Sequence, residues 1–299
     1  MNTLLTGATG FLGKYIVKYL QDSNYKIIIL GIENTCDITC DLSHELPKLN
    51  CEYEMIIHAA GKAHLNPATS EEEQLFFDIN FQGTKNLCLA LEKNIIPKVF
   101  IFISTVAVYG LESGENIDES FPLNGLTPYA LSKIQAEDYL VKWCSKNNVK
   151  LGILRPSLIA GKYPPGNLGS MINGIKTGKY FRIGDGAARK SLLMADDIGR
   201  IIPKLAELGG VYNVCDNHHP SFAELEELIS TQLQLSVPKS IPLWIAKGFA
   251  LIGDKIGNKF PINSFKLEKM ITSLTFSNEK AKHDLGWEPL DVMQNFKIH

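Results

Sequence analysis

The sequence has no excess of positive charge. Its 299 residues contain 30 Lys and Arg against 32 Asp and Glu, which gives a net charge of −2 at pH 7. A protein that binds a nucleic-acid backbone needs a basic surface, because each phosphate that it contacts carries a negative charge. The composition therefore argues against nucleic acid as a partner.

Long apolar runs are also missing. The most apolar late stretch, IPLWIAKGFALIG at residues 241–253, is far shorter than the ~20 residues that a bilayer-spanning helix needs, and Lys247 interrupts it. We expect a helix packed on the protein's own core or part of a substrate lid, with peripheral membrane contact as the alternative. The first residues lack the apolar run of a signal peptide, so we expect a cytoplasmic protein.

Metal-binding patterns are missing as well. Of six cysteines only Cys36 and Cys40 lie close together, and no histidine or second cysteine pair completes a zinc set. We expect no metal site, and free buried thiols in a reducing cytosol. His58 ends a predicted buried strand, and we expect it to be structural.

Apolar strand-like runs alternate with longer helix-like segments. The sequence predicts strands at residues 3–6, 26–30, 55–58, 99–104, 150–154 and 210–214, and helices at residues 10–22, 71–94 and 127–147. Continuous apolar strands between helices are typical of a parallel sheet that helices cover on both faces. The sequence therefore predicts a doubly wound α/β fold.

Three helix starts carry capping signals. Ser70 and Glu73, and later Ser221 and Glu224, have the spacing of a capping box. Thr127 is the expected N-cap of its helix, with a proline in the first turn.

A glycine-rich turn follows the first predicted strand. Gly7, Gly10 and Gly13, in TGATGFLG, are spaced G-x-x-G-x-x-G between a strand and a helix. The first glycine permits a tight turn, the second lets the backbone approach a pyrophosphate, and the third lets helix and strand pack closely. The turn predicts a dinucleotide site, and a turn that serves packing alone is the alternative.

The acidic residue that usually follows the second strand of such a site is absent. Leu30 and Gly31 stand where a carboxylate would bind the adenosine ribose of NAD and repel the 2′-phosphate of NADP. No arginine follows to bind that phosphate, and Glu33 either reaches back to the ribose or faces solvent. We expect NAD or NADP, with a slight preference for NAD.

Tyr129 and Lys133 stand four residues apart on one predicted helix and share a face. A tyrosine has a free pKa of about 10, which is too high for efficient proton exchange at neutral pH. A nearby ammonium group favours the phenolate and lowers that pKa. The two residues are candidate catalytic groups, and a pair on the helix surface is the alternative.

These motifs together resemble the extended short-chain dehydrogenase/reductase superfamily, which holds the NAD-dependent epimerases and dehydratases. TPYALSK resembles its Y-x-x-x-K pair. FISTVAVYG resembles the segment in which a Ser or Thr hydroxyl stands four residues before the Tyr of V-Y-G, here Tyr109. The resemblance implies a Rossmann-type fold and makes Thr105 the catalytic hydroxyl beside Tyr129 and Lys133, with Ser104 as the second candidate.

The resemblance also implies which residues bind the cofactor. The acidic–apolar pair Asp41-Leu42 would flank the adenine, the small residues of IIHAAG would let the cofactor pass, and LRPSLIAG would border the nicotinamide. Asn80 matches a family asparagine that supports the structure. The expected cofactor-binding residues are Gly7, Thr9, Gly10, Phe11, Leu12, Gly13, Asp41, Leu42, Ala59, Ala60, Gly61, Lys133, Pro156 and Ser157.

The substrate and the assembly follow from the same resemblance. RKSLLMADDIG resembles the stretch in which a basic residue meets the diphosphate of a nucleotide sugar, so Arg189 or Lys190 is expected to bind substrate together with Thr105 and Tyr129. Helices 71–94 and 127–147 resemble those that form a four-helix dimer interface, which implies a homodimer.

The strand–helix alternation loosens after Arg155, which divides the chain into two domains. Residues 1–156, with about 191–214, are expected to form the dinucleotide-binding domain. Residues 157–190 and 215–299 do not continue the alternation, and we expect them to form a smaller substrate-binding cap over the carboxyl ends of the strands.

Two departures from the family pattern narrow the reaction. The 4,6-dehydratases carry an Asp-Glu pair just after the catalytic threonine, where this chain has Val106 and Ala107, so dehydration is not expected. Leu158 replaces an asparagine of many 4-epimerases, a variant that resembles bacterial 4-ketoreductases and epimerase-like proteins.

The resemblance thus implies hydride transfer at a sugar carbon, C4, of a nucleotide-diphosphate sugar in bacterial polysaccharide precursor synthesis, by an epimerase or a 4-ketoreductase. Two other functions stay open. One is a reductase of a steroid- or flavonoid-like ketone, and the other is a non-catalytic dinucleotide-binding redox sensor.

Overall fold

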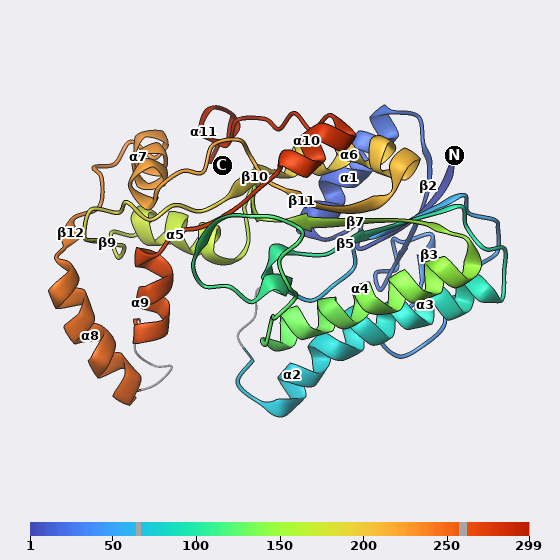
Figure 1. Cartoon of the computed structure of the whole chain (residues 1–299), viewed down its shortest axis with the longest axis horizontal. Helices are drawn as coiled ribbons and strands as arrows, with labels where there is room; N and C mark the ends of the chain where they lie inside the picture. Colours follow the sequence, from blue (N-terminus) through green and yellow to red (C-terminus); the bar gives the residue numbers. More distant parts are fainter. Residues whose placement is uncertain (64–66, 257–261, 299) are drawn as a thin grey trace.

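A computed structural model describes residues 1–63, 67–256 and 262–298. Seven parallel strands form its central sheet in the order β11-β7-β5-β4-β1-β2-β3 (Figure 1). The strands are β1 (Asn2–Thr6), β2 (Lys26–Gly31), β3 (Ile38–Thr39), β4 (Met55–His58), β5 (Val99–Ile103), β7 (Lys150–Pro156) and β11 (Gly210–Val214). The strand order reverses at β1, which is the doubly wound Rossmann arrangement. The predicted fold class and six of these strands are confirmed, and β3 was not predicted.

Helices cover both faces of the sheet. In Figure 1, α1 (Phe11–Asp22) and α6 (Ala195–Leu208) lie above it, and α2 (Ser70–Phe76), α3 (Gly83–Glu92) and α4 (Pro128–Asn147) lie below. Successive residues of a strand point to opposite faces. Ile57 and Ile101 therefore pack in one core cluster with α1 and α6, whereas Ile56 and Phe100 pack in another with α3 and α4.

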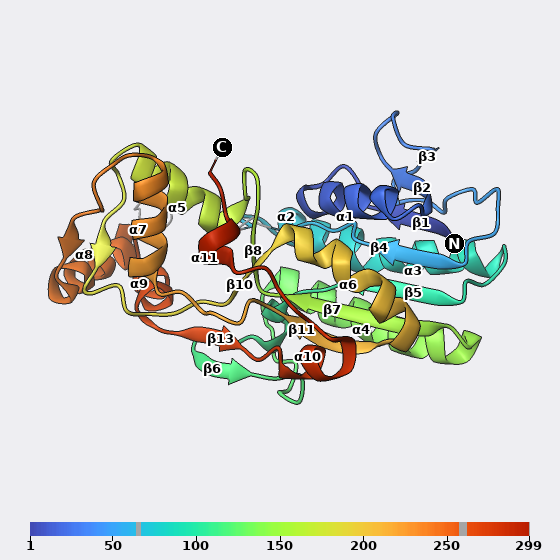
Figure 2. The same cartoon turned by 90° about the horizontal axis from the view of Figure 1, so that it is seen from above.

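The remaining elements gather beyond one end of the sheet (Figure 2). They are β8 (Leu158–Ala160), α5 (Gly166–Lys176), β9 (Arg182–Ile183), β10 (Leu192–Met194), α7 (Phe222–Gln232), β12 (Ser240–Ile241), α8 (Leu243–Ile256), α9 (Ser264–Ile271) and α11 (Val292–Asn295). Beside the sheet, β6 (Gly114–Ile117) pairs with β13 (Leu274–Phe276). The helix α10 (Glu279–Leu285) returns to the sheet, where Leu285 and Trp287 pack with the residues of α6.

The segment predicted as one helix over residues 71–94 is divided. A π-helical turn, Phe77–Gln82, separates α2 from α3. The N-cap of α2 is Thr69, whose side chain accepts a hydrogen bond from the Glu72 backbone at 3.3 Å, so the capping box predicted at Ser70 was wrong by one residue. The predicted caps Thr127 and Ser221 are confirmed, the latter in a complete capping box with Glu224.

The apolar stretch at residues 241–253 forms most of α8. Unlike a core helix, α8 leaves most of its large apolar side chains exposed. Its buried residues are the small ones, Ala246, Ala250 and Gly253. Within the described ranges no helix combines the length and the apolar character needed to cross a bilayer. The cysteines are free, and four of them are buried as expected, whereas Cys36 is half-buried and Cys51 is exposed.

Candidate active site

The glycine turn leaves no room for side chains. Gly7 has a φ of +73°, and a Cβ there would lie 2.5 Å from the Ala60 backbone nitrogen, while a Cβ on Gly13 would overlap the Gly7 carbonyl. Gly10 is the N-cap of α1 and has no side chain to cap the helix. Among the described residues, no capping side chain bonds to the first N–H groups of α1, so these groups can bind an anion. The turn therefore fits a pyrophosphate.

Glu33 folds back onto this turn. Thr9 donates a hydrogen bond from its Oγ1 to Glu33 Oε1 at 2.9 Å, and this bond lowers the pKa of the carboxyl group. A Cβ on Gly31 would stand 3.2 Å from Glu33 Oε2. Because Gly31 has no side chain, the Glu33 carboxylate can lie close to the backbone at the end of β2.

The other expected cofactor contacts line the same edge of the sheet. Leu42 is buried, and its carbonyl accepts a hydrogen bond from Asn86 Nδ2 at 2.7 Å, whereas Asp41 is exposed and bonds to Ser43. Gly61 follows β4, and a Cβ there would lie 3.1 Å from Lys133 Nζ.

Lys133 points from α4 to the carboxyl end of β5. Its Nζ donates to the Ile103 carbonyl at 2.9 Å and stands 4.5 Å from the centre of the Phe102 ring. Burial lowers the pKa of Lys133 to about 8, and the negative charge of Glu137 opposes this effect. The ammonium group is therefore held beside Gly61, close to the glycine turn.

Tyr129 lies one turn before Lys133 on α4. Burial raises the pKa of its hydroxyl, and a hydrogen bond with the Thr105 side chain partly offsets the rise. The chain by itself therefore keeps the phenol protonated, because burial outweighs the favourable bond.

The two candidate hydroxyls point to different partners. Thr105 accepts a hydrogen bond from the Ala107 backbone at 3.1 Å and bonds to Tyr129. The Ser104 hydroxyl instead donates to Glu137 in the buried core. The structure brings Thr105 to Tyr129 and directs Ser104 away, as expected for consecutive residues at the end of a strand.

A buried ion pair supports this arrangement, and the sequence reasoning missed it. Arg155, near the end of β7, donates to both carboxylate oxygens of Glu137, at 3.2 and 2.6 Å, and to Tyr109 Oη at 3.0 Å. Tyr109 in turn donates to Asn213 at 2.7 Å. The available signal was the position of Glu137, four residues after Lys133 on the same helix face.

A second buried network joins the sheet to α4. Asn80, in the π-helical turn, bonds to the backbone of Lys62 and donates to Ser132 Oγ at 2.9 Å, and Ser132 donates to the Tyr129 carbonyl. Asn80 thus links the Lys62 backbone to the helix that carries Tyr129.

His58 is fully buried between two threonines. Its Nδ1 lies 2.6 Å from Thr6 Oγ1, and its Nε2 lies 3.0 Å from Thr84 Oγ1. Thr84 donates to the Asn80 carbonyl, so it accepts from Nε2–H, and the histidine is the neutral Nε2–H tautomer. Burial lowers the pKa of His58 to about 3.

The remaining candidates lie at the carboxyl end of β7 and in the segment before β10. Pro156 ends β7, and Ser157 Oγ is buried without a hydrogen-bond partner among the described residues. Arg189 is exposed and donates to the His219 carbonyl and to Glu224. Lys190 is half-buried, and burial lowers its pKa to about 8.

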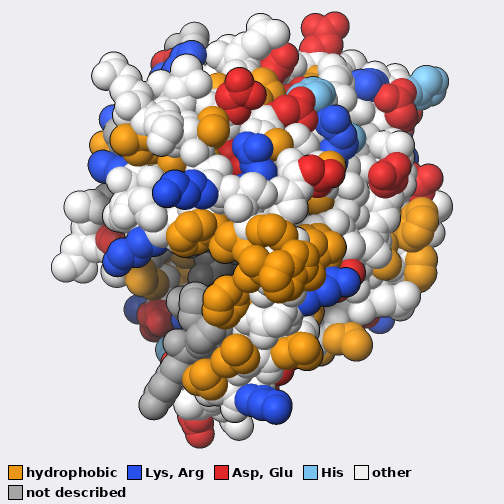
Figure 3. Space-filling model, turned by 90° about the vertical axis from the view of Figure 1, so that its left-hand side faces the viewer, with side chains coloured by type: hydrophobic (Ala, Val, Ile, Leu, Met, Phe, Trp, Pro, Cys, Tyr) orange, Lys and Arg blue, Asp and Glu red, His pale blue; other side chains and the backbone are white. Residues whose placement is uncertain are grey.

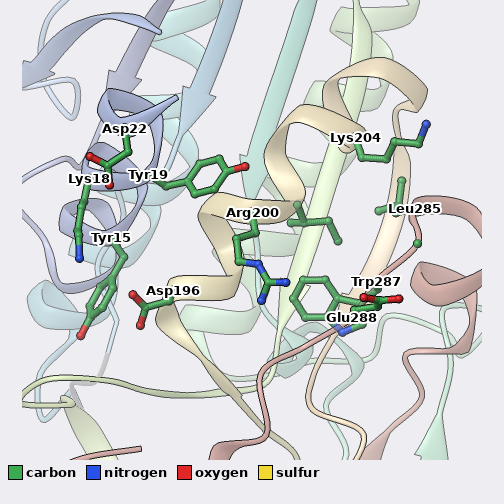
Figure 4. Close-up of a pocket in the computed structure, with 12 residues that line it drawn as sticks. Tyr15, Lys18, Tyr19, Asp22, Asp196, Arg200, Lys204, Leu285, Trp287 and Glu288 are labelled. Carbon is green, nitrogen blue, oxygen red and sulfur yellow. The ribbon is translucent and has the colours of Figure 1, made fainter. Parts of the chain in front are cut away.

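A separate surface pocket of about 490 Å³ lies between α1, α6 and the segment after α10 (Figure 4). Its lining mixes cations and carboxylates: Tyr15, Lys18, Tyr19, Asp22, Asp196, Arg200, Ile201, Lys204, Leu285, Gly286, Trp287 and Glu288. It contains neither Tyr129 nor Lys133, so it is distinct from the candidate active site.

Comparisons with known proteins identify sequence relatives of this chain. The model of the NAD dependent epimerase/dehydratase family matches residues 3–215. One relative, the N-acetyl-α-D-glucosaminyl-diphospho-ditrans,octacis-undecaprenol 4-epimerase of Escherichia coli O157:H7, is 29% identical over 96% of this chain and 90% of its own. The UDP-glucose 4-epimerase of Vibrio cholerae is 27% identical over 97% and 92%.

The fold is similar to solved structures as well. The UDP-glucose 4-epimerase of Thermotoga maritima, solved with UDP-glucose, superposes with a TM-score of 0.75 at 21% identity and covers 98% of this chain and 96% of its own. The match to the family model spans the glycine turn, Thr105, Tyr129 and Lys133. The chain therefore belongs to the NAD-dependent epimerase/dehydratase family.

Proposed function

We propose that this chain transfers hydride at C4 of a sugar carried on a diphosphate, as an epimerase or a 4-ketoreductase in the cytoplasmic synthesis of bacterial polysaccharide precursors. The observation that carries the proposal is the placement of Lys133, whose Nζ donates to the Ile103 carbonyl at 2.9 Å beside Gly61, one turn of α4 after Tyr129. Thr105 lies near enough to Tyr129 to lower the pKa of the tyrosine hydroxyl. Val106 and Ala107 stand where dehydratases of the family carry an acidic pair, so elimination of water lacks its acid and base.

Each residue of the site has a role in this reaction. A bound nicotinamide would supply or accept the hydride. Tyr129 gives a proton to the sugar oxygen or takes one from it, and Thr105 orients that oxygen. Lys133 would hold the nicotinamide ribose, and its charge would stabilise Tyr129 when the phenol loses its proton. The Ser157 hydroxyl, which is buried without a hydrogen-bond partner among the described residues, would offer a polar group to the nicotinamide.

We propose NAD rather than NADP as the cofactor. The Glu33 carboxylate lies against Thr9 of the glycine turn, where it can bind ribose hydroxyls. A carboxylate in this place repels a 2′-phosphate. Glu33 thus replaces the acidic residue that the end of β2 lacks.

We propose that Arg189 and Lys190 supply positive charge to the substrate diphosphate. Lys190 is the more buried of the two and its pKa is lowered by burial, so an anionic partner would stabilise its charged form. One relative is named for a sugar linked through diphosphate to undecaprenol and another for UDP-glucose, and both substrates share a sugar diphosphate. Replacing both cations should abolish binding of a sugar diphosphate but leave binding of an uncharged ketone intact.

The reaction can be identified on the purified protein. Bound nucleotide is extracted and identified, and the protein is then incubated with UDP-, dTDP- and polyprenyl-diphosphate-linked sugars. An epimerase retains its cofactor and interconverts two sugars without net oxidation of NADH or NADPH. A reductase oxidises one equivalent for each product formed. Nucleotide binding with no turnover of any sugar would contradict the proposal and favour the redox sensor.

A further inference from the structure

The helix α8 places its apolar side chains outward. Its buried residues, Ala246, Ala250 and Gly253, follow an i, i+4, i+7 pattern and form one narrow stripe. Its exposed large apolar residues are Leu243, Trp244, Phe249, Leu251, Ile252 and Ile256. A helix on a water-facing surface normally buries its large apolar residues, so α8 has the reverse pattern.

Three of the exposed apolar residues share one side of α8 with Lys255. Trp244, Leu251 and Ile252 are spaced i, i+7, i+8, on the side of α8 opposite the buried stripe. The side chains of Trp244 and Leu251 are 75% and 63% exposed. On the neighbouring α9, Phe265 is also exposed, and Figure 3 shows hydrophobic side chains gathered on this end of the molecule.

The charge around this face is positive. The described residues 239–256 and 262–271 contain five lysines and two carboxylates, a local net charge of +3 in a chain whose total is −2. One of these lysines, Lys269, pairs with Glu112 at 3.3 Å. Lys247 and Lys255 belong to α8 itself, and one of the two carboxylates, Asp254, is bonded to Ser264. A second copy of the chain would bring the same positive charge against this face, so the pattern favours an anionic partner.

We propose that α8 and α9 dock on an anionic membrane surface. A helix of 14 residues is about 21 Å long and too short to span a bilayer, but it can lie in the plane of the headgroups. Tryptophan prefers that depth, and lysines extend their ammonium groups toward lipid phosphates while their stems cover apolar surface.

A membrane-docking surface on α8 also indicates which substrate the enzyme uses. This assignment of the substrate rests on the proposed function. A sugar joined through diphosphate to a polyprenol stays at the membrane, because its lipid chain remains in the bilayer. An enzyme held on that surface by α8 would meet such a substrate at high local concentration. A soluble nucleotide sugar would need no such surface.

The full chain is tested by flotation with vesicles of phosphatidylglycerol and phosphatidylethanolamine, and with vesicles of phosphatidylcholine alone. We expect it to float with the anionic vesicles and to bind the neutral ones at least tenfold more weakly. A Trp244→Glu/Leu251→Glu variant should bind anionic vesicles at least tenfold more weakly than wild type. The matched control is Ile95→Glu/Leu208→Glu, which adds the same charge at exposed apolar positions elsewhere and should bind as wild type.

Fluorescence gives a second readout. Trp143 and Trp287 are buried, so a blue shift of the emission on vesicle binding reports Trp244. The inference is overturned if the wild type ignores anionic vesicles, if both double variants bind equally well, or if substitution on α8 abolishes self-association instead. Flotation needs no turnover, so failure of the proposed hydride transfer would leave this result intact.

Discussion

Tyr129 is the residue on which the proposed chemistry depends most. Thr105 lies near enough to lower the pKa of the Tyr129 hydroxyl, which can exchange a proton with substrate. Tyr129→Phe should lower kcat by about 100-fold or more, because the reaction loses its general acid. Tyr139→Phe makes the same change on the same helix and should leave kcat unaltered. A Tyr129→Phe enzyme with wild-type turnover would remove this residue from the mechanism.

A substitution of Glu33 tests whether the enzyme prefers NAD to NADP. Glu33→Gln removes the negative charge and keeps the shape of the side chain, so it should raise the preference for NADPH over NADH roughly tenfold. The measurement is kcat/KM for both cofactors. Thr9→Val removes the hydrogen bond to Glu33 but leaves the charge, and it should shift this ratio far less. If neither variant changes the ratio, Glu33 does not face the ribose.

His58 makes the free energy of unfolding depend on pH. The folded protein keeps it neutral down to about pH 3, whereas an unfolded histidine takes up a proton below about pH 6.5. Its contribution is therefore fully present above pH 6.5 and is lost as the pH falls from there toward 3, by up to about 1.4 kcal/mol per pH unit. Urea unfolding of His58→Gln at several pH values should show a flatter dependence in this window. His44→Gln, on the surface, should keep the wild-type slope.

At the scale of elements, the π-helical turn between α2 and α3 determines where Asn80 points. A π-helical turn has a wider hydrogen-bond repeat than an α-helix, and such turns are frequent at functional sites. Asn80 bonds from this turn to the Lys62 backbone, next to Gly61 and thus near Lys133. The element therefore connects the loop after β4 to the helix that carries the Tyr–Lys pair.

Asn80→Ala should lower both stability and turnover. It leaves the Lys62 backbone and Ser132 without their buried partner, which costs about 1–3 kcal/mol in the free energy of unfolding. We expect kcat to fall on the order of tenfold with little change in substrate KM, since the asparagine positions the catalytic helix. Asn94→Ala removes a side chain that bonds to the loop carbonyls of Leu49 and Cys51, and it should leave kcat unchanged.

At the scale of the whole molecule, the predicted homodimer would form through the outer face of the helices α2, α3 and α4. A groove on this face is lined by Gln74, Phe77, Asp78, Phe81, Gln82 and Gln135. Leu89 is exposed on α3. Two phenylalanines among polar groups, with an exposed leucine beside them, give a mixed face of the kind that a two-fold interface would bury.

Sedimentation at micromolar concentration tests the assembly. The wild type should be a dimer, and Leu89→Glu should weaken dimerisation at least tenfold, because it buries a carboxylate in the interface. Leu208→Glu, at the end of α6 on the other face of the sheet, should remain dimeric. A monomeric wild type would refute the predicted dimer.

The sequence by itself determined six strands of the central sheet, the helices α1 and α4, and the glycine turn. These features depend on local patterns: continuous apolar runs form strands buried on both faces, capping residues start helices, and glycines form the phosphate turn. The Tyr–Lys pair belongs to the same group, since a spacing of four on a helix fixes a shared face.

The tertiary structure decided what depends on distant neighbours. Ser104 and Thr105 are both hydroxyls at the end of one strand, and only the position of Glu137 and Tyr129 separates their roles. Glu33 reaches Thr9 because the chain turns back after β2. The outward apolar face of α8 was likewise invisible in its composition, because burial depends on which surfaces of the fold a helix meets.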